Sequence, residues 1–196
     1  CTQLFHRFRH IPQDSDIELH CGFRSDHGVR EMLSEYATLH FGLNKETTIE
    51  FLKERNFDKI IIIDSEEYIE AIRELELNST IIVEVHTSIE RNLEYLTRIE
   101  KNDIDAFVTV SRYMIGRIQH HIQPELLEIK VERFQNVLDT EVFLNEDITS
   151  TGFPVIAWVG KIDDHKDWKA FMQISSIIHK QNSEIEFWII GGQTCP

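Results

Sequence analysis

The sequence has few cysteines, and their arrangement excludes two kinds of architecture. Its 196 residues include three, Cys1, Cys21 and Cys195, an odd number with no Cys-x-x-Cys spacing. A disulfide scaffold needs pairs of cysteines, and a structural zinc site needs closely spaced ones. We therefore expect neither, and we expect a reducing, cytoplasmic location.

Long apolar runs and an excess of basic residues are also missing. Apolar runs such as residues 60–63 and 187–190 are only a few residues long, whereas a membrane-spanning helix needs about 20. Thirty-four acidic residues against twenty basic ones give a net charge of −14. Nucleic acids and anionic membranes attract basic surfaces. We expect no transmembrane segment and no nucleic-acid partner, and the composition leaves the oligomeric state open.

Two fingerprints of nucleotide-binding proteins are absent. The sequence contains neither Gly-x-Gly-x-x-Gly nor Gly-x-x-x-x-Gly-Lys-[Ser/Thr], which argues against an NAD-dependent enzyme and against a P-loop protein. Metal motifs are also lacking, because adjacent His120 and His121 would point about 100° apart on a helix, and Asp163-Asp164 lacks the spacing of an Asp-x-Asp site. We expect no cofactor and no metal.

The chain does contain a regular alternation of short apolar runs and longer segments of helical period. It predicts βαβ units and a parallel sheet, and hence an α/β fold. Residues 58–64, apolar and bounded by acids, read as a strand buried on both faces of the sheet. Residues 89–99 read as one helix with an apolar face, in which Glu94 pairs with Arg98. The other expected strands are residues 17–23, 80–86, 105–110, 128–134, 154–159 and 185–190, and we expect the strand at 154–159 to be buried. The other expected helices begin at Ser65, after the cap residue Ser111, and near Lys166.

A cluster of Asn, Asp, Thr, Ser and Gly at residues 144–152 marks a domain boundary. We expect residues 1–146 to form a Rossmann-like parallel-sheet domain, and we leave open that its first strand is missing. Residues 147–196 read as the first βαβ unit of a second Rossmann-like domain. One βαβ unit cannot bury both faces of a sheet, so we expect this second domain to be truncated.

The segment with the most chemical information follows the strand at residues 154–159. A strand ending in Gly160, a short polar loop and a helix start make a place where anions bind, because glycine lets a ligand approach the backbone and the helix N-terminus offers free N–H groups. Lys161 and Lys166 flank this turn. The alternative is an ordinary strand–helix loop whose lysines are only solvated.

The order Gly-Lys-Ile-Asp-x-x-Lys-x-Trp over residues 160–168 resembles the G-R-L-x-x-x-K-G segment of family-4 (group 1) glycosyltransferases of the GT-B fold. In that family the segment opens the C-terminal domain. The resemblance implies that Gly160, Lys161 and Lys166 bind the diphosphate of a nucleotide-sugar donor. The sequence departs from the family twice: Lys161 stands where Arg is usual and lacks its bidentate fork, and Asp167 stands where Gly is usual.

Three more segments follow the order of that family. Residues 83–87 resemble the strand that ends in a histidine facing the donor sugar, and residues 105–111 resemble its D-A-x-x-x-V-S strand. Residues 133–143 resemble the I-P-N-G-V-D-x-x-x-F approach to the interdomain linker, with Gln135 for the usual Pro and Val137 for the usual Gly.

The resemblance implies further site residues. His86 would be the catalytic-site residue that orients the donor sugar, and Asn136 and Gly192 would contact the donor. From the residues alone, His86 is equally a histidine hydrogen-bonded to backbone at a strand end, and Asn136 is equally a turn residue.

The resemblance implies a hexosyltransferase that moves a sugar from a nucleotide-diphosphate donor to a hydroxyl of a glycan, lipid or small-molecule acceptor, with the retaining outcome usual in the family. Lys161 and Lys166 would stabilise the leaving diphosphate without a metal. The family's paired glutamates are not in this sequence, so we expect the fragment itself to be almost inactive. The alternative is a non-catalytic α/β binding or structural module.

Overall fold

The computed structural model describes residues 2–12, 14–138, 140, 152, 154–163 and 166–192. The chain divides into two compact units, residues 1–140 and 141–196, which are described separately below. Apart from Gly152, the segment 144–152 that sets the expected domain boundary lies outside the described residues.

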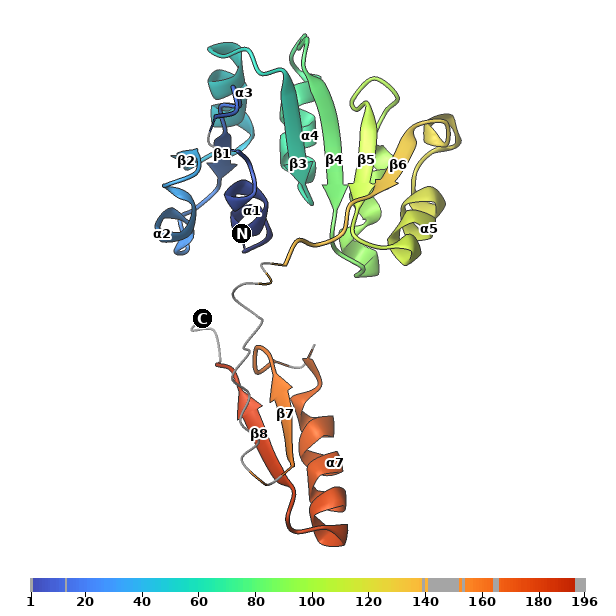
Figure 1. The fold of residues 1–196 in the computed structure, drawn as a ribbon. Helices are drawn as coiled ribbons and strands as arrows, with labels where there is room; N and C mark the ends of the chain where they lie inside the picture. Colours follow the sequence, from blue (N-terminus) through green and yellow to red (C-terminus); the bar gives the residue numbers. More distant parts are fainter. Residues whose placement is uncertain are drawn as a thin grey trace. The chain divides into compact units, whose positions relative to one another are not determined.

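The first unit contains two parallel sheets (Figure 1). β1 (His20–Phe23) pairs with β2 (Thr38–Phe41). The larger sheet has the order β3-β4-β5-β6 and is parallel throughout. Its strands are β3 (Lys59–Ile63), β4 (Thr80–Val85), β5 (Ala106–Thr109) and β6 (Lys130–Arg133). The α/β class and the parallel sheet are thus confirmed, and the arrangement is consistent with a Rossmann-like fold.

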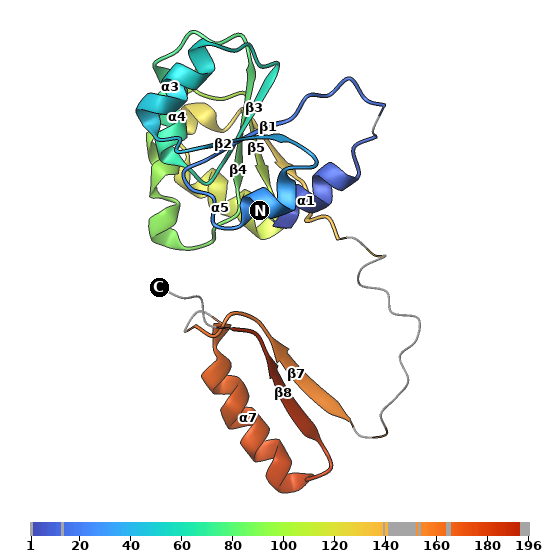
Figure 2. The same ribbon diagram turned by 90° about the vertical axis from the view of Figure 1, so that its left-hand side faces the viewer.

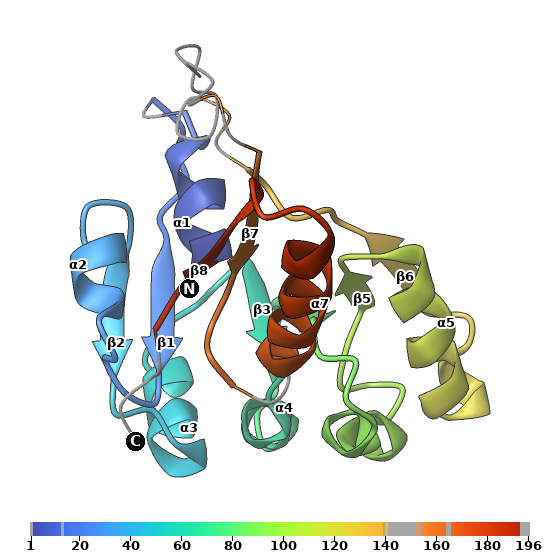
Figure 3. The ribbon, with the colours of Figure 1, turned by 90° about the horizontal axis from the view of Figure 1, so that it is seen from below.

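The helices of this unit lie on opposite sides of the larger sheet. They are α1 (Thr2–Arg9), α2 (Val29–Leu33), α3 (Lys45–Lys53), α4 (Glu66–Arg73) and α5 (Arg112–His121), with 3-10 helices η1 (Glu90–Asn92), η2 (Glu94–Arg98) and η3 (Pro124–Leu126). α3, α4 and α5 cover one face and α1 lies on the other, as the side and end views show (Figures 2 and 3).

The core lies between the sheet and the helices α3, α4 and α5. Ile62, Val83 and Phe107 point into it, and Phe107 is 0% exposed. The opposite face of β3 is open, and Ile61 is 52% exposed. The prediction that residues 58–64 are buried on both faces is therefore wrong, because Ile62 packs in the core while Ile61 and Ile63 on the other face stay exposed.

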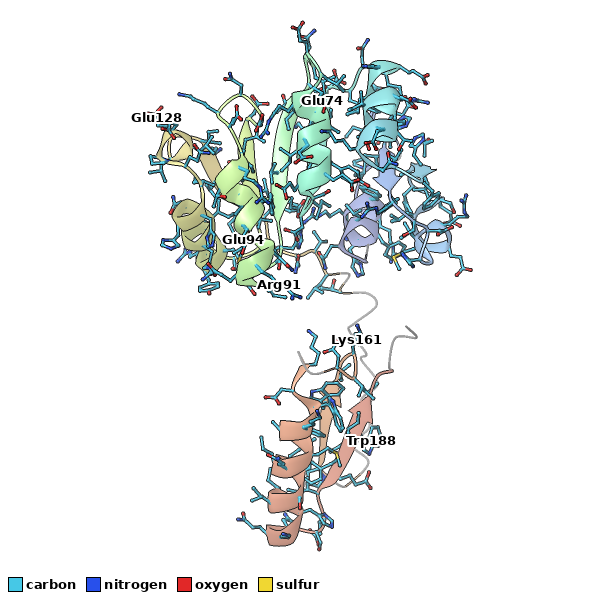
Figure 4. All side chains as sticks on the ribbon, turned by 180° about the vertical axis from the view of Figure 1, so that it is seen from behind. Glu74, Arg91, Glu94, Glu128, Lys161 and Trp188 are labelled. Atoms are coloured by element: carbon cyan, nitrogen blue, oxygen red, sulfur yellow. The ribbon has the colours of Figure 1, made fainter. Side chains whose placement is uncertain are left out.

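The prediction of a single helix at residues 89–99 is also wrong. Two short 3-10 helices, η1 and η2, follow one another there. Leu93, Leu96 and Ile99 are buried as the apolar spacing predicts, but Arg98 pairs with Glu66 on α4 instead of Glu94. Arg91 and Glu94 lie on the surface of this segment (Figure 4).

Helix caps were predicted with mixed success. Ser111 caps α5, since its Oγ accepts the N–H of Met114 at 3.2 Å. Ser65 precedes α4, but its side chain accepts no capping hydrogen bond. α3 begins with a reciprocal capping box between Asn44 and Thr47 that the sequence analysis did not identify.

A pocket of about 150 Å³ separates β1 from β3. Phe23 accepts a backbone N–H from the β2 side, so the neighbouring Gly22 directs its backbone groups the other way, toward this pocket. Asp64 donates its N–H toward β4, so Ile63 and Ile61 direct theirs away from β4. Strands of both sheets line this pocket, and none of the predicted site residues does.

The described residues of the second unit form one βαβ. β7 (Val155–Val159) and β8 (Glu186–Ile190) form a parallel pair, and α7 (Trp168–Gln181) packs against it through Phe171 and Phe187. Val159 is 72% exposed, and Trp188 on β8 is 50% exposed (Figure 4). The prediction that residues 154–159 form a buried strand is wrong, because one helix covers only part of a two-stranded sheet.

Among the helices of the described residues, none is long and apolar enough to cross a bilayer.

Candidate functional site

A buried charged group lies at the carboxyl end of β4. Glu84 has a side chain only 3% exposed, and its two carboxylate oxygens accept the guanidinium of Arg7 on α1. Arg7 Nη1 donates to Oε2 at 2.8 Å, and Nη2 donates to Oε1 at 2.6 Å. The guanidinium also stacks on Phe134, 4.7 Å from the ring centre. This ion pair holds α1 against the face of the sheet opposite α3, α4 and α5.

His86 follows Glu84 by two residues, and its Nε2 lies 2.6 Å from Glu84 Oε1. Burial alone would raise the pKa of Glu84, but the hydrogen bonds from Arg7 and His86 outweigh it and hold that pKa below its usual value. Glu84 is therefore ionised at neutral pH, and His86 has a fixed anionic partner.

Asp64 ends β3 beside these residues. Its backbone adopts a left-handed φ of +45°, and its carboxylate accepts the N–H of His86 at 3.0 Å and that of Thr87 at 3.2 Å. Burial raises the pKa of Asp64, in opposition to these two hydrogen bonds. The carboxylate of Asp64 thus fixes the backbone at His86 and Thr87.

Asn136 lies in the exposed segment after β6, and this segment is anchored to α1 at two points. Phe134 receives the guanidinium of Arg7, and the N–H of Val137 donates to Gln3 Oε1 at 2.9 Å. Since Arg7 also binds Glu84, α1 links the segment of Asn136 to the strand end of His86.

In the second unit, glycines form the carboxyl ends of the two strands. The N–H of Gly160 donates to Ile190 O at 3.0 Å, and the N–H of Ile162 donates to Gly192 O at 3.1 Å. Gly191 has a φ of +153°, and a Cβ there would overlap the carbonyl oxygen of Gly160. Only glycine fits at this contact.

Lys161 and Lys166 flank these glycines. Lys161 Nζ lies 3.5 Å from Asp163 Oδ2, and the side chain is about half exposed (Figure 4). The N–H of Lys166 donates to Asp163 Oδ1 at 3.1 Å, and its carbonyl accepts Trp158 Nε1–H at 3.1 Å. Asp167 then takes a left-handed φ of +49° before α7 begins.

The predicted residues therefore form two groups. Gly160, Lys161, Lys166 and Gly192 lie together at one end of β7 and β8, and His86 and Asn136 belong to the first unit. Three residues around His86 were not predicted from the sequence: Arg7, Asp64 and Glu84. A charged residue inside the apolar strand of residues 80–85 was a usable signal for Glu84, because unpaired buried acids are rare. Arg7 gave none, since it lies 77 residues from its partner.

No group of three or more His, Cys, Asp or Glu side chains in the described ranges is arranged to hold a metal ion. The sequence matches no protein-family model and no curated protein at a significant level.

Proposed function

We propose that this chain is part of a GT-B glycosyltransferase that transfers a sugar from a nucleotide-diphosphate donor to an acceptor hydroxyl. Residues 160–168 and 191–192 would bind the donor diphosphate, and His86 would contact the donor sugar. Acting alone, this fragment would have almost no activity, because it lacks the family's paired glutamates.

The observation that carries the proposal is the backbone at Asp167. This residue stands where the resembled motif has glycine, and it adopts the left-handed φ of +49° that glycine favours. Aspartate is among the few other residues that tolerate this conformation. The departure from the motif is thus one of side chain and not of backbone, which supports the alignment of Gly160, Lys161 and Lys166 with the family's diphosphate loop.

The strand ends give a second line of support. Parallel sheets bind ligands at the carboxyl ends of their strands, and here Gly160, Gly191 and Gly192 leave the backbone unshielded by side chains. Two lysines beside such a backbone suit a diphosphate, whose charge increases as the sugar departs. The competing module hypothesis has a specific observation in its favour, the exposed apolar surface around Val159 and Trp188, which suits a binding partner.

Chemical-shift mapping with UDP tests the proposal, since it detects binding even at millimolar affinity. We expect UDP to perturb the amides of Lys161, Ile162 and Gly192, UMP to perturb them less, and uridine to leave them unchanged. Replacing both lysines (K161M/K166M) should weaken UDP binding at least about tenfold, or about 1.4 kcal/mol.

The matched control is Lys180→Met, which removes a lysine from the last turn of α7, at the opposite end of that helix. It should leave UDP binding intact. If millimolar UDP and GDP both leave the amides of residues 160–162 and 191–192 unperturbed, the transferase proposal is wrong and the module hypothesis stands.

A further inference from the structure

The ring of His86 is engaged at one nitrogen only. Its Nε2 lies 2.6 Å from Glu84 Oε1, while Nδ1 has no hydrogen-bond partner among the described residues. His121 differs, because its Nδ1 meets the carbonyl of Arg117 and its Nε2 meets Glu90, both at 2.8 Å. The side chain of His86 is also 28% exposed. Its Nδ1 is therefore available to a ligand.

The partner of Nε2 decides where the proton of the neutral ring lies. An ionised carboxylate can only accept hydrogen bonds, so the nitrogen that faces Glu84 must carry the hydrogen. Arg7 donates to both oxygens of Glu84 and keeps that carboxylate from acting as a donor. The other nitrogen, Nδ1, is then left with a lone pair.

The geometry points to Glu84 as a positioning residue that holds neutral His86 as its Nε2–H tautomer and so makes Nδ1 a hydrogen-bond acceptor for a ligand hydroxyl. Naming that hydroxyl as one of a sugar rests on the proposed function. The assignment of the tautomer and of the acceptor role rests on the contacts of Arg7, Glu84 and His86 alone.

The same arrangement excludes a class of ligand from Nδ1. Carboxylates and fully ionised phosphate esters present only acceptor oxygens, which repel a lone pair, and the buried charge of Glu84 lies just behind the ring. A hydroxyl supplies the donor that Nδ1 needs. His86 therefore selects a hydroxyl-bearing part of a ligand, and a diphosphate needs the cations Lys161 and Lys166.

The test is a long-range proton–nitrogen NMR spectrum of the 196-residue chain, labelled with ¹⁵N-histidine, at pH 8. We expect His86 to give an unprotonated-type Nδ1 signal and an observable, downfield Nε2–H proton, because a short bond to a buried carboxylate slows its exchange with water. E84Q keeps an oxygen acceptor and should keep this proton signal. E84L should lose it through rapid exchange.

Two further variants separate positioning from folding. E84L leaves the guanidinium of Arg7 without its partner, so the double variant R7L/E84L removes both charges and should lose the same proton signal. The control E132L removes an exposed acid from β6, a strand of the same sheet that does not adjoin β4, and should leave the His86 signals unchanged. Acetate, a fully ionised carboxylate at this pH, should also leave them unchanged.

A proton on Nδ1 in the unmodified chain would overturn the inference, and so would an Nε2–H signal that survives in both E84L and R7L/E84L. A shift of Nδ1 on adding acetate would overturn the ligand class. None of these measurements uses a nucleotide, so a failed UDP titration and a failed tautomer assignment are distinguishable results.

Discussion

The two parallel sheets that carry the candidate residues differ in how far their own helices cover them. In residues 1–140 the strands β3 to β6 bury one face under α3, α4 and α5, with Phe107 fully enclosed. Among the described residues of 141–196, one helix packs on the pair β7 and β8, and residues such as Val159 and Trp188 stay exposed. The first sheet is stabilised by its own core, whereas the second has little core to lose.

The strand ends differ in a related way. At β4 the end is built from buried, paired side chains, Arg7 and Glu84 with His86. At β7 and β8 it is built from glycine backbone with solvated lysines beside it. In the first unit the candidate residues therefore also stabilise the fold. In the second, the glycines set the geometry of the strand ends, and the two lysines are exposed to solvent, Lys161 with Asp163 beside it.

The largest effect on stability should come from removing a buried side chain from the core of the first unit. Phe107→Ala removes a fully buried ring, and we expect a loss of about 4 kcal/mol in the free energy of unfolding. The matched change Phe187→Ala acts on a half-buried ring of the second unit, and should cost about 1.5 kcal/mol.

The aromatic residues allow the two units to be followed separately. All four tyrosines lie in residues 1–140 and all three tryptophans lie in residues 141–196. Urea denaturation followed by both signals should show the tyrosine transition shifted by F107A and the tryptophan transition unmoved. Equal losses of unfolding free energy from F107A and F187A would mean that the two rings contribute equally to the stability of their units.

The second effect concerns the glycine contact of the second unit. Gly191→Ala places a Cβ against the carbonyl of Gly160 at a left-handed φ, and β7 and β8 must separate to accommodate it. We expect a loss of about 3 kcal/mol in the tryptophan-reported transition. Gly192→Ala is the matched control, because nothing lies within 4 Å of its added Cβ. If both variants lose the same free energy of unfolding, the close approach of Gly191 to Gly160 does not stabilise the ends of β7 and β8.

Several elements could be predicted from sequence because their signals are local. The strands at residues 59–63, 80–85, 106–109 and 186–190 follow from short apolar runs, and the cap of Ser111 follows from its position before α5. The cluster of Gly160 and Lys161 at a strand end follows from one short segment. These features depend on residues that are neighbours in the chain.

What could not be predicted depends on residues far apart. Whether an apolar strand is buried on one face or two depends on which elements pack against it. The predictions therefore overestimated the burial of β3 and β7. The pairing of Arg7 with Glu84, and the clamp of Asp64 on the backbone of His86, arise only when α1, β3 and β4 meet. In residues 89–99 the apolar spacing was correct, but short 3-10 turns preserve the buried stripe as well as an α-helix does.

The smallest effect is a pH dependence that separates the two carboxylates near His86. The pKa of Glu84 is lowered in the folded chain, so its stabilising contribution is present above its ordinary pKa of 4.5 and is lost as the pH falls below that value. The pKa of Asp64 is raised, so its contribution favours the fold below its ordinary pKa of 3.8 and is lost as the pH rises through the folded value.

The variants E84Q and D64N should therefore show opposite trends in urea denaturation followed by the tyrosine signal. The stability advantage of the unmodified chain over E84Q should shrink as the pH is lowered from 7 toward 4, whereas its advantage over D64N should grow. Asparagine tolerates the left-handed backbone at position 64, so D64N tests the charge and not the turn. If both variants showed the same trend with pH, the pKa values of Glu84 and Asp64 would not be shifted in opposite directions, and the contrast between the paired Glu84 and the desolvated Asp64 would be wrong.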